Sequence, residues 1–178
     1  MKFFGDSLVR GFGVPEDKSW VYLVSKNNFN YGANGATTAD VLSVIRMVKL
    51  SKYTFVMAGL NDFFMNYSFD FTCDNFREII NVLRDQNSVM ILGIPPLPTH
   101  AAVEYGWVGD SVFQNVQIKL NMLKEFFKDM DNVIIIDFNK IFDDILNPED
   151  YFIDGVHPNT VLHSLMADYF LKNLENKL

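Results

Sequence analysis

The sequence is short of the residues that build disulfides and metal sites. It has one cysteine, Cys73, which has no second cysteine to pair with, and three histidines that lie far apart in the chain. These residues do not have the spacing of a zinc site. We therefore expect no internal disulfide, no metal and no cofactor, and we expect the Cys73 thiol to be inert.

Positive charge and long apolar runs are also scarce. There are 15 basic residues against 22 acidic ones, a formal net charge of -7. This charge argues against nucleic acid or an anionic membrane as a partner, because both bind basic surfaces. No apolar run approaches the roughly 20 residues that cross a bilayer, and no charged-then-apolar leader precedes the first strand. We expect a cytoplasmic protein that acts on a small molecule, and the sequence leaves its oligomeric state open.

What the chain does have is enough apolar material for one full core. Of 178 residues 49% are hydrophobic, 17 of them Phe, and no repeat or linker interrupts the pattern, so we expect a single domain over residues 1–178. Apolar runs typical of buried strands occur at Lys2 to Phe4, Asn28 to Tyr31, Tyr53 to Ala58, Val89 to Ile94 and Val133 to Asp137. Helical patterns occur at about 17–28, 37–49, 74–84, 110–130 and 159–174, with Asp110 expected to cap the fourth.

The alternation of strands and helices predicts the fold class. Parallel strands need crossover connections, and crossovers are right-handed, so helices cover both faces of the sheet. We expect a three-layer α/β/α fold with a doubly wound, five-stranded parallel sheet. In such sheets ligands bind beyond the carboxyl ends of the strands.

Four polar segments fall at that rim. They are Gly5-Asp6-Ser7-Leu8 after the first strand, residues 32–38 (GANGATT) after the second, Gly59-Leu60-Asn61-Asp62 after the third, and Asp154-Gly155-Val156-His157-Pro158 before the last helix. Together they supply a hydroxyl nucleophile, a glycine backbone N–H, a side-chain amide and an Asp-x-x-His pair. These are the parts needed for acyl transfer by a serine.

These four segments, in this order, resemble the signature blocks of the SGNH hydrolases, the GDSL-type esterases and lipases. The resemblance extends from Gly5 to His157 and implies a flavodoxin-like SGNH hydrolase fold. It implies that Ser7 is the nucleophile, that His157 is the base and that Asp154 orients His157. It also implies an oxyanion hole made of the Ser7 N–H, the Gly35 N–H and the Asn61 side-chain amide.

The histidines can be ranked on chemical grounds as well. His157 is the only one with an acid at short range, and an Asp three residues earlier can hold its imidazole in the tautomer that leaves Nε2 free. His163 falls within a helix and is expected to be a solvent or packing residue, whereas His100 lies on the long loop of residues 95–109. Structural alternatives stay open for Ser7 as a helix cap, Asn61 as a strand-end cap and Gly35 as a turn residue.

The loop from Pro95 to Gly109 is the best candidate for further substrate contact. It carries two aromatic residues, Tyr105 and Trp107, and loops of this length without structure are often lids. The sequence leaves open whether this one is a lid. Asp6 and Asp62, next to the candidate site residues, are expected to pin loops by bonding to backbone.

We therefore expect a serine esterase that hydrolyses carboxylic esters through an acyl-enzyme. The acyl or acetyl esters of small molecules, carbohydrates and lysolipids all remain open as substrates, as do thioesters. The alternative is a non-enzymatic flavodoxin-like binding module. That alternative fits less well, because Leu8, Val9 and Phe12 stand where a flavin-phosphate loop needs Ser, Thr or Gly.

Overall fold

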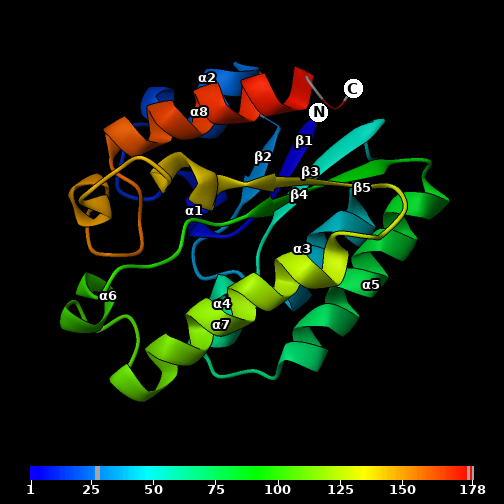
Figure 1. Cartoon of the computed structure of the whole chain (residues 1–178). Coiled ribbons are helices and arrows are strands. Elements are labelled where there is room, and N and C mark those ends of the chain that lie inside the picture. The colour runs from blue at the N-terminus through cyan, green and yellow to red at the C-terminus, as the bar shows by residue number, and fades with distance from the viewer. Residues whose placement is uncertain (27–28, 176, 178) are drawn as a thin grey trace.

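A five-stranded parallel sheet runs through the middle of the computed structural model, which describes residues 1–26, 29–175 and 177 (Figure 1). Its strands are β1 (Lys2–Gly5), β2 (Asn30–Gly32), β3 (Tyr53–Met57), β4 (Val89–Ile94) and β5 (Val133–Asp137). They lie in the order β2-β1-β3-β4-β5, and every pair is parallel. The predicted fold class is confirmed. Of the second expected strand, Asn28 lies outside the described residues.

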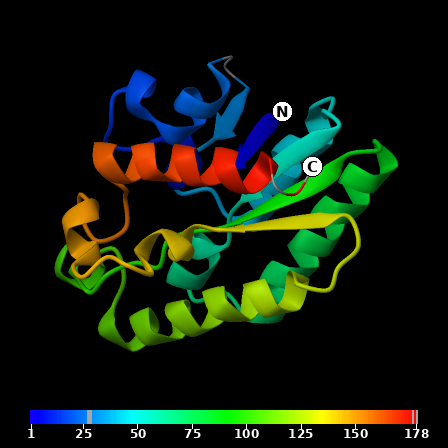
Figure 2. The same ribbon diagram turned by 45° about the horizontal axis from the view of Figure 1, so that its top comes forward.

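Helices cover both faces of this sheet. They are α1 (Ser7–Arg10), α2 (Trp20–Ser25), α3 (Thr38–Met47), α4 (Leu60–Phe64), α5 (Phe69–Asp85), α6 (Ala101–Glu104), α7 (Asp110–Phe127) and α8 (Thr160–Glu175), with 3-10 turns at Glu16–Lys18, Phe138–Phe142 and Pro148–Tyr151. Helices α2 and α8 pack together on one face, while α3, α5 and α7 cover the other. Figure 2 shows the same three layers with α8 brought forward.

An aromatic cluster fills the space between the sheet and the α2/α8 layer. Phe3 of β1 and Phe55 of β3 lie side by side, with ring centroids 5.6 Å apart. Trp20 of α2 packs against both, and Phe170 of α8 lies 5.5 Å from Phe55. Each of these four side chains is fully buried. Fully burying a Phe is worth about 1.5–3 kcal/mol, so this cluster holds α2 and α8 on the sheet.

Several helix boundaries differ from the sequence-based prediction. The first predicted helix is divided, because Ser19 is extended (φ -69, ψ 143) between a 3-10 turn and α2. Helix α5 begins at Phe69 rather than near Asp74, because the Ser68 hydroxyl accepts a hydrogen bond from the Phe71 N–H and so caps an earlier turn.

The ends of α3 and α7 also differ from the sequence-based prediction. Thr37 caps α3 in a capping box with Asp40, but the helix stops before Lys49, which was expected to close it. Helix α7 begins at Asp110 itself, with Gly109 at the cap position and no side-chain cap bond, and it ends at Phe127 rather than Met130. Asp110 is therefore the first helical residue and not the cap.

Two short helices were not predicted at all. Helix α4 follows β3 directly, so Asn61 lies on a helical turn rather than in a loop. Helix α6 interrupts the loop of residues 95–109. Both helices are too short to show a helical period in the sequence.

Candidate active site

Ser7 lies at the end of β1 because the chain turns there from strand into helix. Asp6 caps α1, and Ser7 is its first residue. The turn requires a glycine before it, since a Cβ on Gly5 would lie 2.2 Å from the Met57 carbonyl oxygen and 2.4 Å from Val9 Cγ2. The close approach of α1 to β3 therefore determines where the Ser7 hydroxyl stands.

The structure brings Ser7, His157 and Asp154 into one hydrogen-bonded chain. The Nε2 of His157 lies 3.0 Å from the Ser7 Oγ, and its Nδ1 lies 2.7 Å from the Asp154 Oδ2. A carboxylate only accepts, so the Nδ1–H donates to Asp154 and Nε2 is left to accept from the Ser7 hydroxyl. All three residues are buried. This is the arrangement that converts a serine hydroxyl into a nucleophile.

Asp154 is held by the turn that it shares with His157. Its Oδ1 accepts hydrogen bonds from the backbone N–H groups of Val156 (3.1 Å) and His157 (2.8 Å). Burial alone would raise the pKa of Asp154, but these bonds and the imidazole outweigh it and lower that pKa. Asp154 is therefore ionised at neutral pH and able to stabilise a positive charge on His157.

Three hydrogen-bond donors stand at the same rim. Among the described residues no acceptor pairs with the backbone N–H of Ser7 or of Gly35. The Asn61 amide donates one hydrogen to the Ala36 carbonyl oxygen at 3.0 Å, which leaves its second hydrogen available. A developing oxyanion needs such donors.

Asp62 ties the Asn61 segment to the segment that carries Gly35. Its carboxylate accepts from the Thr38 N–H at 2.9 Å and from the Thr38 hydroxyl at 2.5 Å. The Asn75 amide in turn donates to the Thr38 hydroxyl oxygen. Asp62 thus links α4 to the start of α3, a loop-pinning arrangement of the kind that the sequence suggested.

Asp6 makes fewer contacts than Asp62. Its Oδ1 accepts from the Leu8 N–H at 2.9 Å, whereas its Oδ2 is buried with no partner among the described residues. Burial, with a smaller contribution from the charge of Asp62, raises the pKa of Asp6 from 3.8 to about 7. The residue before Ser7 therefore carries a buried carboxyl group whose pKa is close to neutral pH.

Two exposed aromatic rings pack against the imidazole of His157. The Trp107 ring meets it edge to face, with centroids 5.1 Å apart, and the Phe12 ring lies 4.4 Å away at 46°. Phe12 and Trp107 are themselves 6.5 Å apart. Trp107 was expected near substrate, but Phe12 was missed. The only feature of the sequence that could have pointed to Phe12 is its position five residues after Ser7, between two glycines.

Tyr105 does not join this group. It lies at the end of α6, it is 65% exposed, and its ring makes no aromatic contact with any described residue. The structure therefore brings Trp107 to the site without Tyr105.

The loop of residues 95–109 is fastened to the turn that carries His157. The Thr99 N–H donates to the Gly155 carbonyl oxygen at 2.8 Å. Gly155 has φ +79, and a Cβ on it would lie 2.2 Å from the Ala102 nitrogen, so α6 sits directly on this turn. The Trp107 N–H donates to the Ala102 carbonyl oxygen. These contacts place the Trp107 ring beside His157.

The remaining reactive side chains lie away from Ser7. His163 is buried on α8, where its Nδ1 accepts from the Trp20 N–H at 3.2 Å, and burial lowers its pKa to about 4. It is thus a packing residue rather than a solvent-exposed one. Cys73 lies in the second turn of α5, and burial raises the pKa of its thiol to about 11. His100 is exposed, within 4 Å of Glu104 and Asp110.

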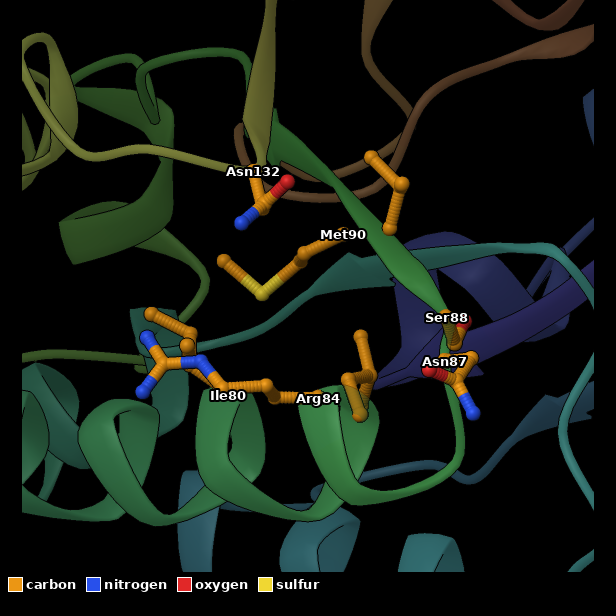
Figure 3. A pocket seen from close by; sticks show the side chains of 8 residues that line it. Ile80, Arg84, Asn87, Ser88, Met90 and Asn132 are labelled. Atoms are coloured by element: carbon orange, nitrogen blue, oxygen red, sulfur yellow. The ribbon is translucent and has the colours of Figure 1, made fainter.

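A separate pocket opens at the opposite end of the strands. It lies between α5 and the start of β4, as Figure 3 shows with Arg84 and Met90, and Asn132 before β5 completes it. Arg84 and Asn132 precede β4 and β5, and Met90 is the second residue of β4, whereas Ser7 and Asn61 follow β1 and β3. The pocket therefore lies on the other edge of the sheet from Ser7.

Among residues 1–26, 29–175 and 177, no three His, Cys, Asp or Glu side chains are grouped so that they could hold a metal ion. Nor does any helix in that part of the chain combine the length and apolarity needed to span a membrane.

Comparison with known proteins gives one family match and a large set of similar folds. The GDSL-like lipase/acylhydrolase family model matches residues 3–165. A lipolytic protein of the G-D-S-L family from Veillonella parvula is 24% identical, with a TM-score of 0.74 over 96% of this chain and 94% of that chain. No curated protein matches the chain.

Two further structures show the same likeness. A GDSL-like lipase from Bacteroides thetaiotaomicron is 20% identical, with a TM-score of 0.76 over 99% of this chain and 87% of that one. An acetylxylan esterase from Geobacillus stearothermophilus is 18% identical, with a TM-score of 0.71 over 97% and 92%. At these identities the structures show a shared fold.

Proposed function

Because the chain belongs to the GDSL-like lipase/acylhydrolase family, a family of hydrolases, we propose that it is a serine esterase that uses Ser7, His157 and Asp154. The observation that carries this proposal is the unbroken hydrogen-bonded chain from the Ser7 Oγ through the imidazole to the Asp154 carboxylate. The fold alone would not support it, since one fold hosts many functions.

The reaction proceeds in two halves. The Ser7 Oγ attacks the ester carbonyl carbon while His157 Nε2 takes its proton, and the same proton then goes to the leaving alcohol oxygen as the C–O bond breaks. The product is an acyl-enzyme on Ser7. Water, deprotonated by His157, attacks this acyl group and releases the carboxylic acid with Ser7 restored.

The negative charge that forms on the carbonyl oxygen is met by the three donors at the rim. These are the N–H groups of Ser7 and Gly35 and the free hydrogen of the Asn61 amide. Preorganised donors of this kind are worth several kcal/mol because they need no reorganisation as the charge develops. The bond from the amide to the Ala36 carbonyl oxygen keeps Asn61 oriented.

The proposed substrates are carboxylic esters of small molecules. Acyl or acetyl esters of simple alcohols, of carbohydrates and of lysolipids are all open to this chemistry, and one of the similar folds is named as an acetylxylan esterase. The reaction needs no metal or cofactor, because His157 supplies the proton transfer.

The direct test is a comparison of Ser7→Ala with Cys73→Ala. Ser7→Ala is expected to abolish hydrolysis of chromogenic esters and labelling by a serine-directed phosphonate, with the urea midpoint unchanged. Cys73→Ala should retain turnover, since that thiol is buried and remains protonated. Substantial activity in Ser7→Ala, or inactivation of the wild type by a chelator, would overturn the proposal.

A further inference from the structure

We propose that Phe12 and Trp107 form the subsite for the alcohol half of the ester, and that this subsite selects alcohols with a flat apolar face. The inference rests on the proposed serine esterase reaction and adds to it which half of the substrate is recognised, and by which residues. Its basis is that both rings pack against the His157 imidazole and lie next to each other.

The reaction geometry assigns this space to the leaving group. In the tetrahedral intermediate the carbon carries four groups: the Ser7 Oγ, the oxyanion, the acyl substituent and the leaving oxygen. The oxyanion faces the donors at Ser7, Gly35 and Asn61. His157 must reach the leaving oxygen with Nε2 to protonate it. The alcohol therefore extends past the imidazole, where Phe12 and Trp107 stand.

Both rings are partly exposed to solvent beside His157. Phe12 is 37% exposed and Trp107 is 46% exposed, and they meet at 85° with centroids 6.5 Å apart. Two rings set nearly perpendicular form a corner rather than a parallel sandwich, so a flat group can stack on one ring while its edge meets the other.

Trp107 also offers one polar group to the alcohol. The indole N–H of Trp107 donates to none of the described residues, so it can donate to an oxygen on the alcohol.

The corner is held in place by the fold rather than by the exposed side chains alone. The backbone N–H of Trp107 donates to the carbonyl oxygen of buried Ala102, and α6 rests on Gly155. On the other side, the Phe12 N–H donates to the Ser7 carbonyl oxygen at 3.0 Å. The subsite is therefore largely formed before substrate arrives, which reduces the entropy lost on binding.

The test compares esters that share an acetyl group and differ in the alcohol. Benzyl acetate and an acetylated methyl pyranoside present a flat aryl face and a flat sugar face, and ethyl acetate presents neither. In Trp107→Ala and in Phe12→Ala, kcat/KM for at least one of the flat substrates should fall about tenfold, with ethyl acetate changing less than twofold. A fall in kcat/KM for benzyl acetate would identify the alcohol as aryl, and a fall for the acetylated pyranoside would identify it as a sugar.

A second series separates the two halves of the ester. With benzyl alcohol kept constant, the ratio of kcat/KM for acetate to butyrate should be the same in the wild type and in both variants. Phe71→Ala serves as the matched control, because this ring is also exposed (44%) but contacts Tyr67 rather than His157. It should leave every ratio unchanged.

Two outcomes would overturn the inference. One is an unchanged preference between flat and ethyl acetates in both variants, with thermal midpoints like that of the wild type. The other is a shift in the acetate-to-butyrate ratio, which would assign the rings to the acyl group. Either result would leave Ser7→Ala inactive. Activity in Ser7→Ala would instead remove the proposed esterase mechanism itself, so the two failures are distinguishable.

Discussion

The His157 Nε2 lies 3.0 Å from the Ser7 Oγ, although 150 positions separate the two residues in the chain. Ser7 is placed by the tight turn after β1, and His157 by a turn on which the loop of residues 95–109 rests. A hydrogen bond between side chains from such distant segments depends on both turns at once. Substitutions that shift either turn should therefore affect turnover more than stability.

Gly155→Ala tests the turn that carries His157. A methyl group there would clash with the Ala102 nitrogen at 2.2 Å, and φ +79 is unfavourable for alanine. We expect α6 and the turn to move apart and kcat/KM to fall about 10- to 100-fold, since small displacements of catalytic groups are costly. Steady-state kinetics on a chromogenic acetate would measure the loss.

Gly109→Ala is the control for this change. Gly109 lies at the end of the same loop with φ -78, and a Cβ there would meet nothing within 4 Å. It should leave kcat/KM within twofold of the wild type. Similar kinetics in the two variants would mean that contact between α6 and Gly155 does not position His157.

Asn61→Ala tests the oxyanion donor. The variant should lose about 10²–10³ in kcat, roughly 2.7–4 kcal/mol, with little change in KM, because the donor is needed when negative charge develops. It also loses the bond to the Ala36 carbonyl oxygen, so the free energy of unfolding should fall by about 1 kcal/mol. Kinetics and urea unfolding on one preparation separate these effects.

Asn75→Ala provides a matched comparison for Asn61→Ala. Its amide also donates one hydrogen bond, to the Thr38 hydroxyl at 2.9 Å, and this bond is part-buried like that of Asn61. It should lower stability by about 1 kcal/mol and leave kcat near the wild-type value. If Asn61→Ala behaved in the same way, Asn61 would have a structural role only.

Asp6→Asn tests the buried carboxyl of the residue before Ser7. The pKa of Asp6 is about 7 in the folded protein and 3.8 ordinarily, so between these values the folded state binds the extra proton. Its contribution to the free energy of unfolding therefore falls as pH rises from about 4 to 7, by up to about 1.4 kcal/mol per pH unit. Asparagine does not titrate. Urea unfolding across this range should show wild type losing stability relative to Asp6→Asn, and a constant difference would contradict the assignment.

His163→Gln should show the opposite sign. The pKa of His163 is about 4 in the folded protein and 6.5 ordinarily, so the unfolded state binds more protons between these values. Wild-type stability should rise relative to the variant as pH rises from about 4 to 6.5, and be lost as pH falls. The glutamine carbonyl keeps an acceptor near the Trp20 N–H. A difference that did not vary with pH would show that His163 titrates normally.

These two pH effects overlap and oppose one another in the wild-type protein. Asp6 favours folding toward the acid end of the range, and His163 favours it toward neutral pH. A nearly flat wild-type curve between about pH 4 and 6.5 is the expected result from this pair. Only the differences between the wild type and each variant reveal the individual groups.

The strands and the four polar segments could be predicted from the sequence because their signals are local. The runs Val89–Ile94 and Val133–Asp137 are strands with the predicted bounds. Both are short and rich in β-branched residues, which favours a strand over a helix. The order of strands and helices then placed the segments around Ser7 and Asn61 at one rim, as parallel connections require.

The tertiary structure decided what depends on segments distant in sequence. The break at Ser19, the burial of Asp6 and the bond from Trp20 to His163 follow from how α1, α2 and α8 pack on the sheet. The corner formed by Phe12 and Trp107 has no local signal, because 95 residues separate them and neither shows a periodic pattern. Side-chain packing between layers set their positions, and the Gly155 contact with α6 made that packing possible.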